Sequence, residues 1–111
     1  MEAIALTSKN GVPIASYMER EEENESFSTL SATIFGASEV IFSGFEKKNP
    51  NLVMGDSDDT VLLIRELGTN AVLSMLGDAE HKEELIDKID EMVSEIDILQ
   101  KASEIKEVLK K

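Results

Sequence analysis

The stretch SFSTLSATIFGASEVIFSGF, residues 26–45, decides the fold, because its spacing predicts one helix with two apolar stripes. The residues of the first stripe recur at intervals of four, four, three and four: Phe27, Ser31, Phe35, Ser38 and Phe42. The second stripe has a similar rhythm, with intervals of four, three, four and four: Leu30, Ile34, Ala37, Ile41 and Phe45. A helix that packs on a single core needs only one such stripe. Two stripes predict burial against two bodies, the chain's own sheet and a partner.

Gly36, in the interior of this helix, supports the same interpretation. A helix-interior glycine costs about 1 kcal/mol relative to alanine. Close approach of a partner backbone would offset that cost. The alternative is a single, unusually well-buried core helix that tolerates an incidental glycine.

Short strand-like runs lie on both sides of the helix. Residues 3–8 and 12–18 flank Asn10-Gly11, which predicts a hairpin with a type I′ turn. Three runs at 51–56, 60–67 and 70–77 are separated by Asp-, Ser- and Gly-rich breaks and predict an antiparallel meander. Two lysines before Pro50 are expected to occupy the last turn of the central helix. The predicted order is β-β-α-β-β-β-α, an α+β domain with one five-stranded antiparallel sheet.

The tail from Glu80 to Lys111 predicts a long C-terminal helix, with Asp78 as its N-cap. Apolar residues recur there about every 3.5 positions: Leu85, Ile89, Met92, Ile96, Leu99, and Ile105 with Leu109. About 30 helical residues extend roughly 45 Å, more than strands of this length can cover. We therefore expect one domain over 1–111, with a core at about 3–96 and an extension at about 97–111. The extension must bend back, project or pair with another chain. The helical pattern is weakest at residues 100–103, where a break in the helix would occur.

The charge of the chain excludes several function classes. Twenty-three acidic residues against 11 basic ones give a net charge of −12. Binding to nucleic acid or to an anionic membrane needs a clustered basic surface, so neither is expected. The chain has no cysteine, no apolar run long enough to span a bilayer and no signal-peptide pattern near its first residues. The expected location is cytoplasmic.

Catalytic signatures are poorly represented. The single histidine, His81, has no acid–base partner at a telling spacing, and Asp56 to Thr60 lacks the glycine and distal glutamate of a calcium loop. Arg65, alone among apolar residues, is interpreted as a surface strand charge or a pair for a carboxylate. There is no phosphate-binding glycine loop and no nucleophile elbow. We expect no enzyme activity, no cofactor and no metal, with a carboxylate-based acid–base enzyme as a remote alternative.

Four segments together resemble the roadblock family, the dynein-light-chain type of domain. They are NGVPIAS at 10–16, SxLSAxxFGA at 28–37, VLLIRxLG at 61–68 and NAVL at 70–73. The likeness spans about residues 3–96, and it rests on the order and spacing of mostly small and apolar residues. The chain is similar to a prokaryotic member that lacks the family's usual helix before the first strand. The long C-terminal helix is a candidate to take that place, from its own chain or by exchange with a partner.

The resemblance implies a roadblock/profilin-like fold and a homodimer. In the family, third strands pair edge to edge and central helices pack side by side. Carried over, the implied interface comprises the first stripe and the third strand: Phe27, Ser31, Phe35, Ser38, Phe42, Asn51, Leu52, Val53, Met54 and Gly55. The implied function is that of a non-enzymatic adaptor, scaffold or regulator of a small Ras-like GTPase. The alternative is a sensor domain that binds a small molecule between helix and sheet.

Overall fold

The computed structural model describes the backbone of residues 2–109 and the side chains of residues 2–96. Its strands are β1 (Ala3–Ser8), β2 (Pro13–Met18), β3 (Leu52–Asp56), β4 (Thr60–Leu67) and β5 (Ala71–Asp78). Its helices are α1 (Asn24–Gly44) and α2 (Lys82–Leu109), each preceded by a short 3-10 turn, at Glu21–Glu23 and Ala79–His81. The predicted order of elements is confirmed.

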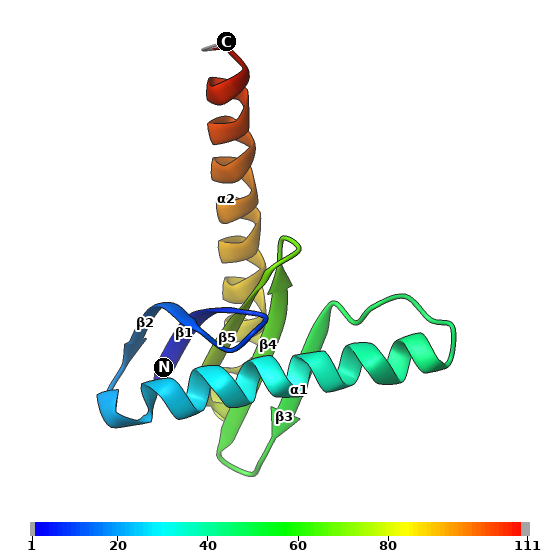
Figure 1. Cartoon of the computed structure of the whole chain (residues 1–111). Helices are drawn as coiled ribbons and strands as arrows, with labels where there is room; N and C mark the ends of the chain where they lie inside the picture. Colours follow the sequence, from blue (N-terminus) through cyan, green and yellow to red (C-terminus); the bar gives the residue numbers. More distant parts are fainter. Residues whose placement is uncertain (1, 110–111) are drawn as a thin grey trace.

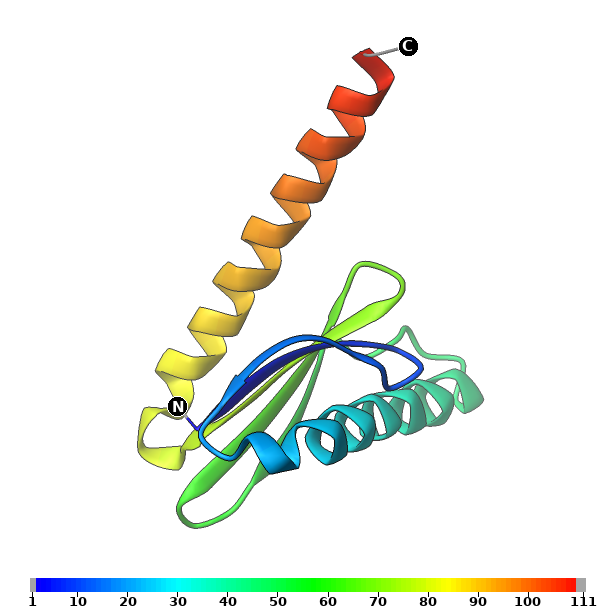
Figure 2. The ribbon, with the colours of Figure 1, turned by 60° about the vertical axis from the view of Figure 1, so that its left-hand side comes forward.

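The five strands form one antiparallel sheet in the order β2-β1-β5-β4-β3. The predicted meander is β3-β4-β5, and the predicted hairpin is β1-β2. Helix α1 crosses one face of the sheet and α2 lies on the other (Figures 1 and 2). The molecule is therefore a three-layer α/β/α arrangement with β2 and β3 at its edges.

Each helix buries a separate apolar core against the sheet. The core under α2 is the larger one, and it comprises Val61, Leu63, Leu67, Leu73, Met75, Leu85, Ile89 and Val93. The core under α1 is small, with Ala32 and Phe35 against Ile64 and Val72. Strand residues alternate between these cores because successive side chains point to opposite faces of a sheet.

The β1–β2 connection differs from the predicted type I′ turn. Gly11 has φ +89°, but Asn10 is not among the described residues with positive φ. The Gly11 N–H donates to the Ser8 carbonyl at 2.9 Å, and the Ser8 N–H donates to the Val12 carbonyl at 2.9 Å. This is a longer loop that ends in a left-handed glycine, a common alternative to the two-residue turn.

Helix α1 ends earlier than predicted. Its last residue is Gly44, so Lys47 and Lys48 lie beyond the helix rather than in its last turn. The Lys47 N–H donates to the Phe42 carbonyl at 2.9 Å and the Glu46 N–H to the Ser43 carbonyl at 3.0 Å. These two bonds form a Schellman motif, in which Glu46 adopts φ +57° at the position that usually holds glycine.

Helix α2 is continuous through residues 100–103, so the break considered there does not occur. Asp78 precedes the 3-10 turn but makes no side-chain capping bond. Three arrangements were predicted for the extension, and the structure shows the second of them: its backbone projects past the sheet (Figures 1 and 2).

Candidate protein-interaction site

Helix α1 does carry two stripes, but their expected roles are exchanged. Ser31 is 2% exposed and Phe35 is 1% exposed, because they pack on the chain's own sheet. The predicted partner-facing role of these two residues is therefore wrong. The second stripe is the one that faces solvent: Leu30, Ile34, Ala37, Ile41 and Phe45. We call it the outer stripe.

The small residues in α1 explain this exchange. Ser28, Ser31 and Ala32 are buried opposite a sheet face that carries small side chains of its own, including Ala5 and Ser74. Small residues on both sides let a helix approach a sheet closely. The small size of the residues on the first stripe was the sequence signal for the sheet-facing side of α1. The spacing of the apolar residues does not contain that information.

The remaining members of the predicted stripe are less buried. Ser38 is half-buried and donates from Oγ to the Phe35 carbonyl at 2.7 Å. Phe42 is 40% exposed although it lies in line with Phe35. The reason is that α1 extends past β3, so its last turns have no sheet beneath them (Figure 1). Val40, Ile41 and Phe45 are more than half exposed on the same segment.

Strand β3 provides an adjacent open edge. Within the described part of the chain it pairs with β4 alone, in register from Leu52↔Arg65 to Asp56↔Val61. Leu52 and Val53 are half-buried against the two cores, whereas Asn51, Met54 and Gly55 are exposed. An open edge offers unpaired backbone N–H and C=O groups to another strand. Helix α1 passes across β3 (Figure 1), and we call the exposed residues at its end, Val40, Ile41, Phe42 and Phe45, together with the edge residues 51–55 the α1–β3 surface.

Partly exposed ion pairs link both helices to the sheet or to its loops. Lys9 Nζ lies 3.4 Å from Glu39 on α1 and 3.4 Å from Glu66 on β4. Arg65 pairs with Asp90 of α2, so its predicted carboxylate partner is found within the same chain. Partly exposed pairs of this kind contribute roughly 0–1 kcal/mol each. They therefore contribute little to the stability of the fold.

The residues that were considered for chemistry make ordinary surface contacts. His81 Nδ1 is 3.6 Å from Glu84, with both side chains exposed. Asp56 pairs with Lys82 at 3.1 Å, and Ser57 bonds locally to Asp59 and Thr60. Among the described residues, no group of three or more His, Asp or Glu side chains is placed to hold a metal ion. None of the described helices is both long and apolar enough to cross a bilayer.

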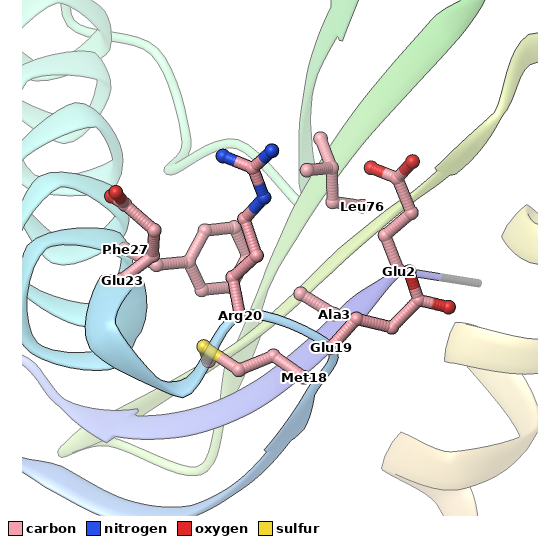
Figure 3. A pocket seen from close by; sticks show the side chains of 8 residues that line it. All are labelled: Glu2, Ala3, Met18, Glu19, Arg20, Glu23, Phe27 and Leu76. Carbon is pink, nitrogen blue, oxygen red and sulfur yellow. The ribbon is translucent and has the colours of Figure 1, made fainter.

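A pocket of about 450 Å³ opens between the start of α1 and the nearby end of the sheet (Figure 3). Ala3, Met18, Phe27 and Leu76 form its apolar lining, and the remaining lining residues are charged: Glu2, Glu19, Arg20 and Glu23. Phe27, a predicted interface residue, belongs to this pocket. The volume is within the range of small-molecule sites.

Solved structures with the same architecture are found at low sequence identity. A Roadblock/LC7 domain from Streptomyces avermitilis superposes with a TM-score of 0.80 and 15% identity, covering 87% of this chain and 82% of the other. The chain has the roadblock fold. MglB from Myxococcus xanthus superposes with a TM-score of 0.71 and 17% identity, covering 86% and 83% of the two chains. MglB from Thermus thermophilus gives 0.62 and 16%, over 69% of this chain and 60% of the other.

Comparison at the level of sequence gives no further support for membership of a family. No protein-family model matches the chain, and no curated protein matches it either. The likeness to the roadblock family thus rests on the fold and on the four segments quoted above.

Proposed function

We propose that this roadblock-fold chain is a non-enzymatic adaptor or regulator that forms a homodimer and docks a small Ras-like GTPase or serves as a scaffold subunit, in the cytoplasm. The observation that carries the proposal is the α1–β3 surface. Six large apolar side chains of α1 and its C-cap are at least 40% exposed: Leu30, Ile34, Val40, Ile41, Phe42 and Phe45. Contiguous apolar patches of this kind mark interaction sites in monomeric domains.

The geometry supports a two-fold pairing through this surface. A second β3 added at the open edge would extend the sheet beneath the overhanging end of α1, where Phe42 now faces solvent. The same patch on both copies would meet, as an isologous interface requires. Asn51, Leu52, Val53, Met54, Gly55 and Phe42 therefore stay in the proposed interface, and Ser31 and Phe35 are removed from it. Ile41 and Phe45 are added from the outer stripe.

The GTPase partner is proposed from the resemblance to the roadblock family. The paired helices of two copies would form a broad apolar platform on one side of the joined sheet.

The first experiment is molar mass by light scattering over a wide concentration range. A persistent species of about 24 kDa, twice the 12.2 kDa chain, is expected for a closed pair. Ile41→Glu should shift it to the monomer, since the glutamate would be desolvated at the interface. A monomer at every concentration would overturn the homodimer.

Docking is tested separately, with a panel of small Ras-like GTPases loaded with GDP or a GTP analogue. Binding by at least one of them, dependent on the bound nucleotide, is the expected result. If the dimer forms and no GTPase binds in either state, the GTPase part is wrong and the scaffold role remains.

The pocket between α1 and the sheet favours a second candidate function, a small-molecule sensor. Its apolar lining and its mixed charged rim suit an amphipathic ligand of about 450 Å³ or less. Thermal stabilisation by a metabolite panel, abolished by Ala3→Phe in the lining, would favour this function. No stabilisation by any member would count against it.

A further inference from the structure

The pocket between the start of α1 and the sheet has an apolar floor at which three strands meet. Ala3 is directly opposite Leu76 in the β1–β5 ladder and directly opposite Met18 in the β1–β2 ladder, so the three side chains lie in one row on the same sheet face. Phe27, near the start of α1, completes the apolar lining. Ala3 and Met18 are buried, whereas Phe27 and Leu76 are only half-buried. The floor therefore has apolar surface that an aliphatic group can still cover.

The rim of the pocket carries four charged side chains of both signs, all of them exposed. Glu2 precedes β1, Glu19 and Arg20 follow β2, and Glu23 lies in the 3-10 turn before α1. The Glu19 N–H donates to the Glu2 carbonyl at 3.1 Å, which holds these two residues side by side. In Figure 3 the Arg20 guanidinium lies between the Glu23 carboxylate on one side and the Glu2 carboxylate on the other.

Arg20 takes part in none of the ion pairs between described residues. The cations of those pairs are Lys9, Arg65, His81 and Lys82. A guanidinium presents its N–H donors in a planar fork that matches the two oxygens of a carboxylate. The rim therefore offers a donor group for an anion, next to carboxylates that favour a cation.

We propose that this pocket binds the zwitterion of a free α-amino acid with an apolar side chain, such as leucine. The ligand carboxylate accepts hydrogen bonds from Arg20, its ammonium group donates to the rim carboxylates, and its side chain covers Phe27 and Leu76. The proposal rests on the sensor function considered above for this pocket, and it names the ligand class.

The charges of the rim argue for a zwitterion over a ligand with one charge. An aliphatic carboxylate would meet one guanidinium and three carboxylates that repel it. An aliphatic amine would be attracted to the carboxylates but would leave Arg20 without a partner. An α-amino acid supplies both charges next to each other, with the apolar group attached to the same carbon atom.

The test is a titration of the full-length protein with three ligands, followed by nuclear magnetic resonance of the backbone amides. The ligands are leucine, 4-methylpentanoate, which lacks the ammonium group, and 3-methylbutylamine, which lacks the carboxylate. We expect leucine to shift the amide signals of Ala3, Phe27 and Leu76. It should bind at least about tenfold more tightly than either analogue, since each analogue loses a set of charge-assisted hydrogen bonds.

Arg20→Gln separates the contribution of the guanidinium from that of the floor. It should weaken leucine binding at least about tenfold without weakening the binding of 3-methylbutylamine, so the preference for leucine over the amine is lost. Arg20 is exposed, so the fold does not depend on it. Lys47→Gln is the matched control, because it removes one positive charge from an exposed residue beyond α1. The control should keep the preference for leucine.

Equal affinity for leucine and its two analogues would overturn the proposal, as would equal effects of Arg20→Gln and Lys47→Gln. If another compound of the metabolite panel binds the pocket and leucine does not, the ligand class is wrong while the sensor function stands. If neither leucine nor any compound of the panel binds, the sensor function fails as well. None of these outcomes depends on the homodimer or on a GTPase, because the lining residues lie outside the α1–β3 surface.

Discussion

Phe35 and Ile41 lie six residues apart on α1, and the same substitution at each should have opposite effects on the stability of the protomer. Phe35 is 1% exposed in the core, whereas Ile41 is 61% exposed. Replacing a buried Phe by Ala costs about 3–5 kcal/mol, and a buried glutamate adds the desolvation of its charge. Phe35→Glu should therefore unfold the chain, whereas Ile41→Glu should change the free energy of unfolding of the protomer by about 0.5 kcal/mol or less. Urea unfolding followed by circular dichroism measures both, at a concentration where the chain is monomeric. Equal destabilisation by the two changes would contradict the assignment of the two stripes.

The backbone conformation of Glu46 leads to a second prediction at the scale of the residue. Its backbone has φ +57° at the end of α1. This left-handed conformation is unfavourable for residues that carry a Cβ. Glu46→Gly relieves this cost at the position where glycine is most common after a helix. We expect the free energy of unfolding to rise by about 1 kcal/mol, or the Tm by a few degrees. Glu46→Ala is the control: it removes the charge, keeps the Cβ and should give no comparable gain.

At the scale of the element, Gly36 distinguishes a helix that only covers the sheet from one that also approaches a partner. A Cβ built at Gly36 would meet no heavy atom within 4 Å, so the protomer gives no packing reason for the glycine. Gly36→Ala should raise the free energy of unfolding of the protomer by about 0.5–1 kcal/mol through helix propensity. If the paired helices approach each other closely there, the same change should weaken the dimer.

Thr33→Ala is the control for that experiment, because Thr33 is exposed on the same helix outside the proposed interface and alanine has the higher helix propensity there too. Analytical ultracentrifugation gives the dimer affinity, and thermal unfolding gives the stability. A more stable protomer with unchanged dimer affinity would show that Gly36 is incidental, the alternative that the sequence left open.

The elements also show how far sequence reasoning reaches in this fold. Strands and helices were predicted to within a few residues, because Asn10-Gly11, Gly68 and the Asp-rich turn at 56–59 interrupt strong apolar patterns. Periodicity also found the two stripes of α1. It could not decide which of them meets the sheet, because that depends on the small residues of β1 and β5 across the core.

The net charge of the whole molecule opposes its own association. Each copy carries −12, and most of the acidic 3-10 turn at Glu21–Glu23 is exposed at the start of α1. The proposed α1–β3 surface is apolar, so the main electrostatic effect on pairing is long-range repulsion. Raising the ionic strength shortens the Debye length from about 30 Å at 0.01 M to about 8 Å at 0.15 M. The dimer should therefore tighten severalfold over that range, measured by sedimentation equilibrium.

Neutralising part of that charge provides the control. Substituting Glu21, Glu22 and Glu23 by Gln removes three exposed carboxylates without touching either core. This variant should pair more tightly at low salt and respond less to added salt, since repulsion between two copies grows with the product of their charges. A dimer that weakens as salt rises would mean that ion pairs hold it together. The apolar α1–β3 surface would then not be the site of pairing.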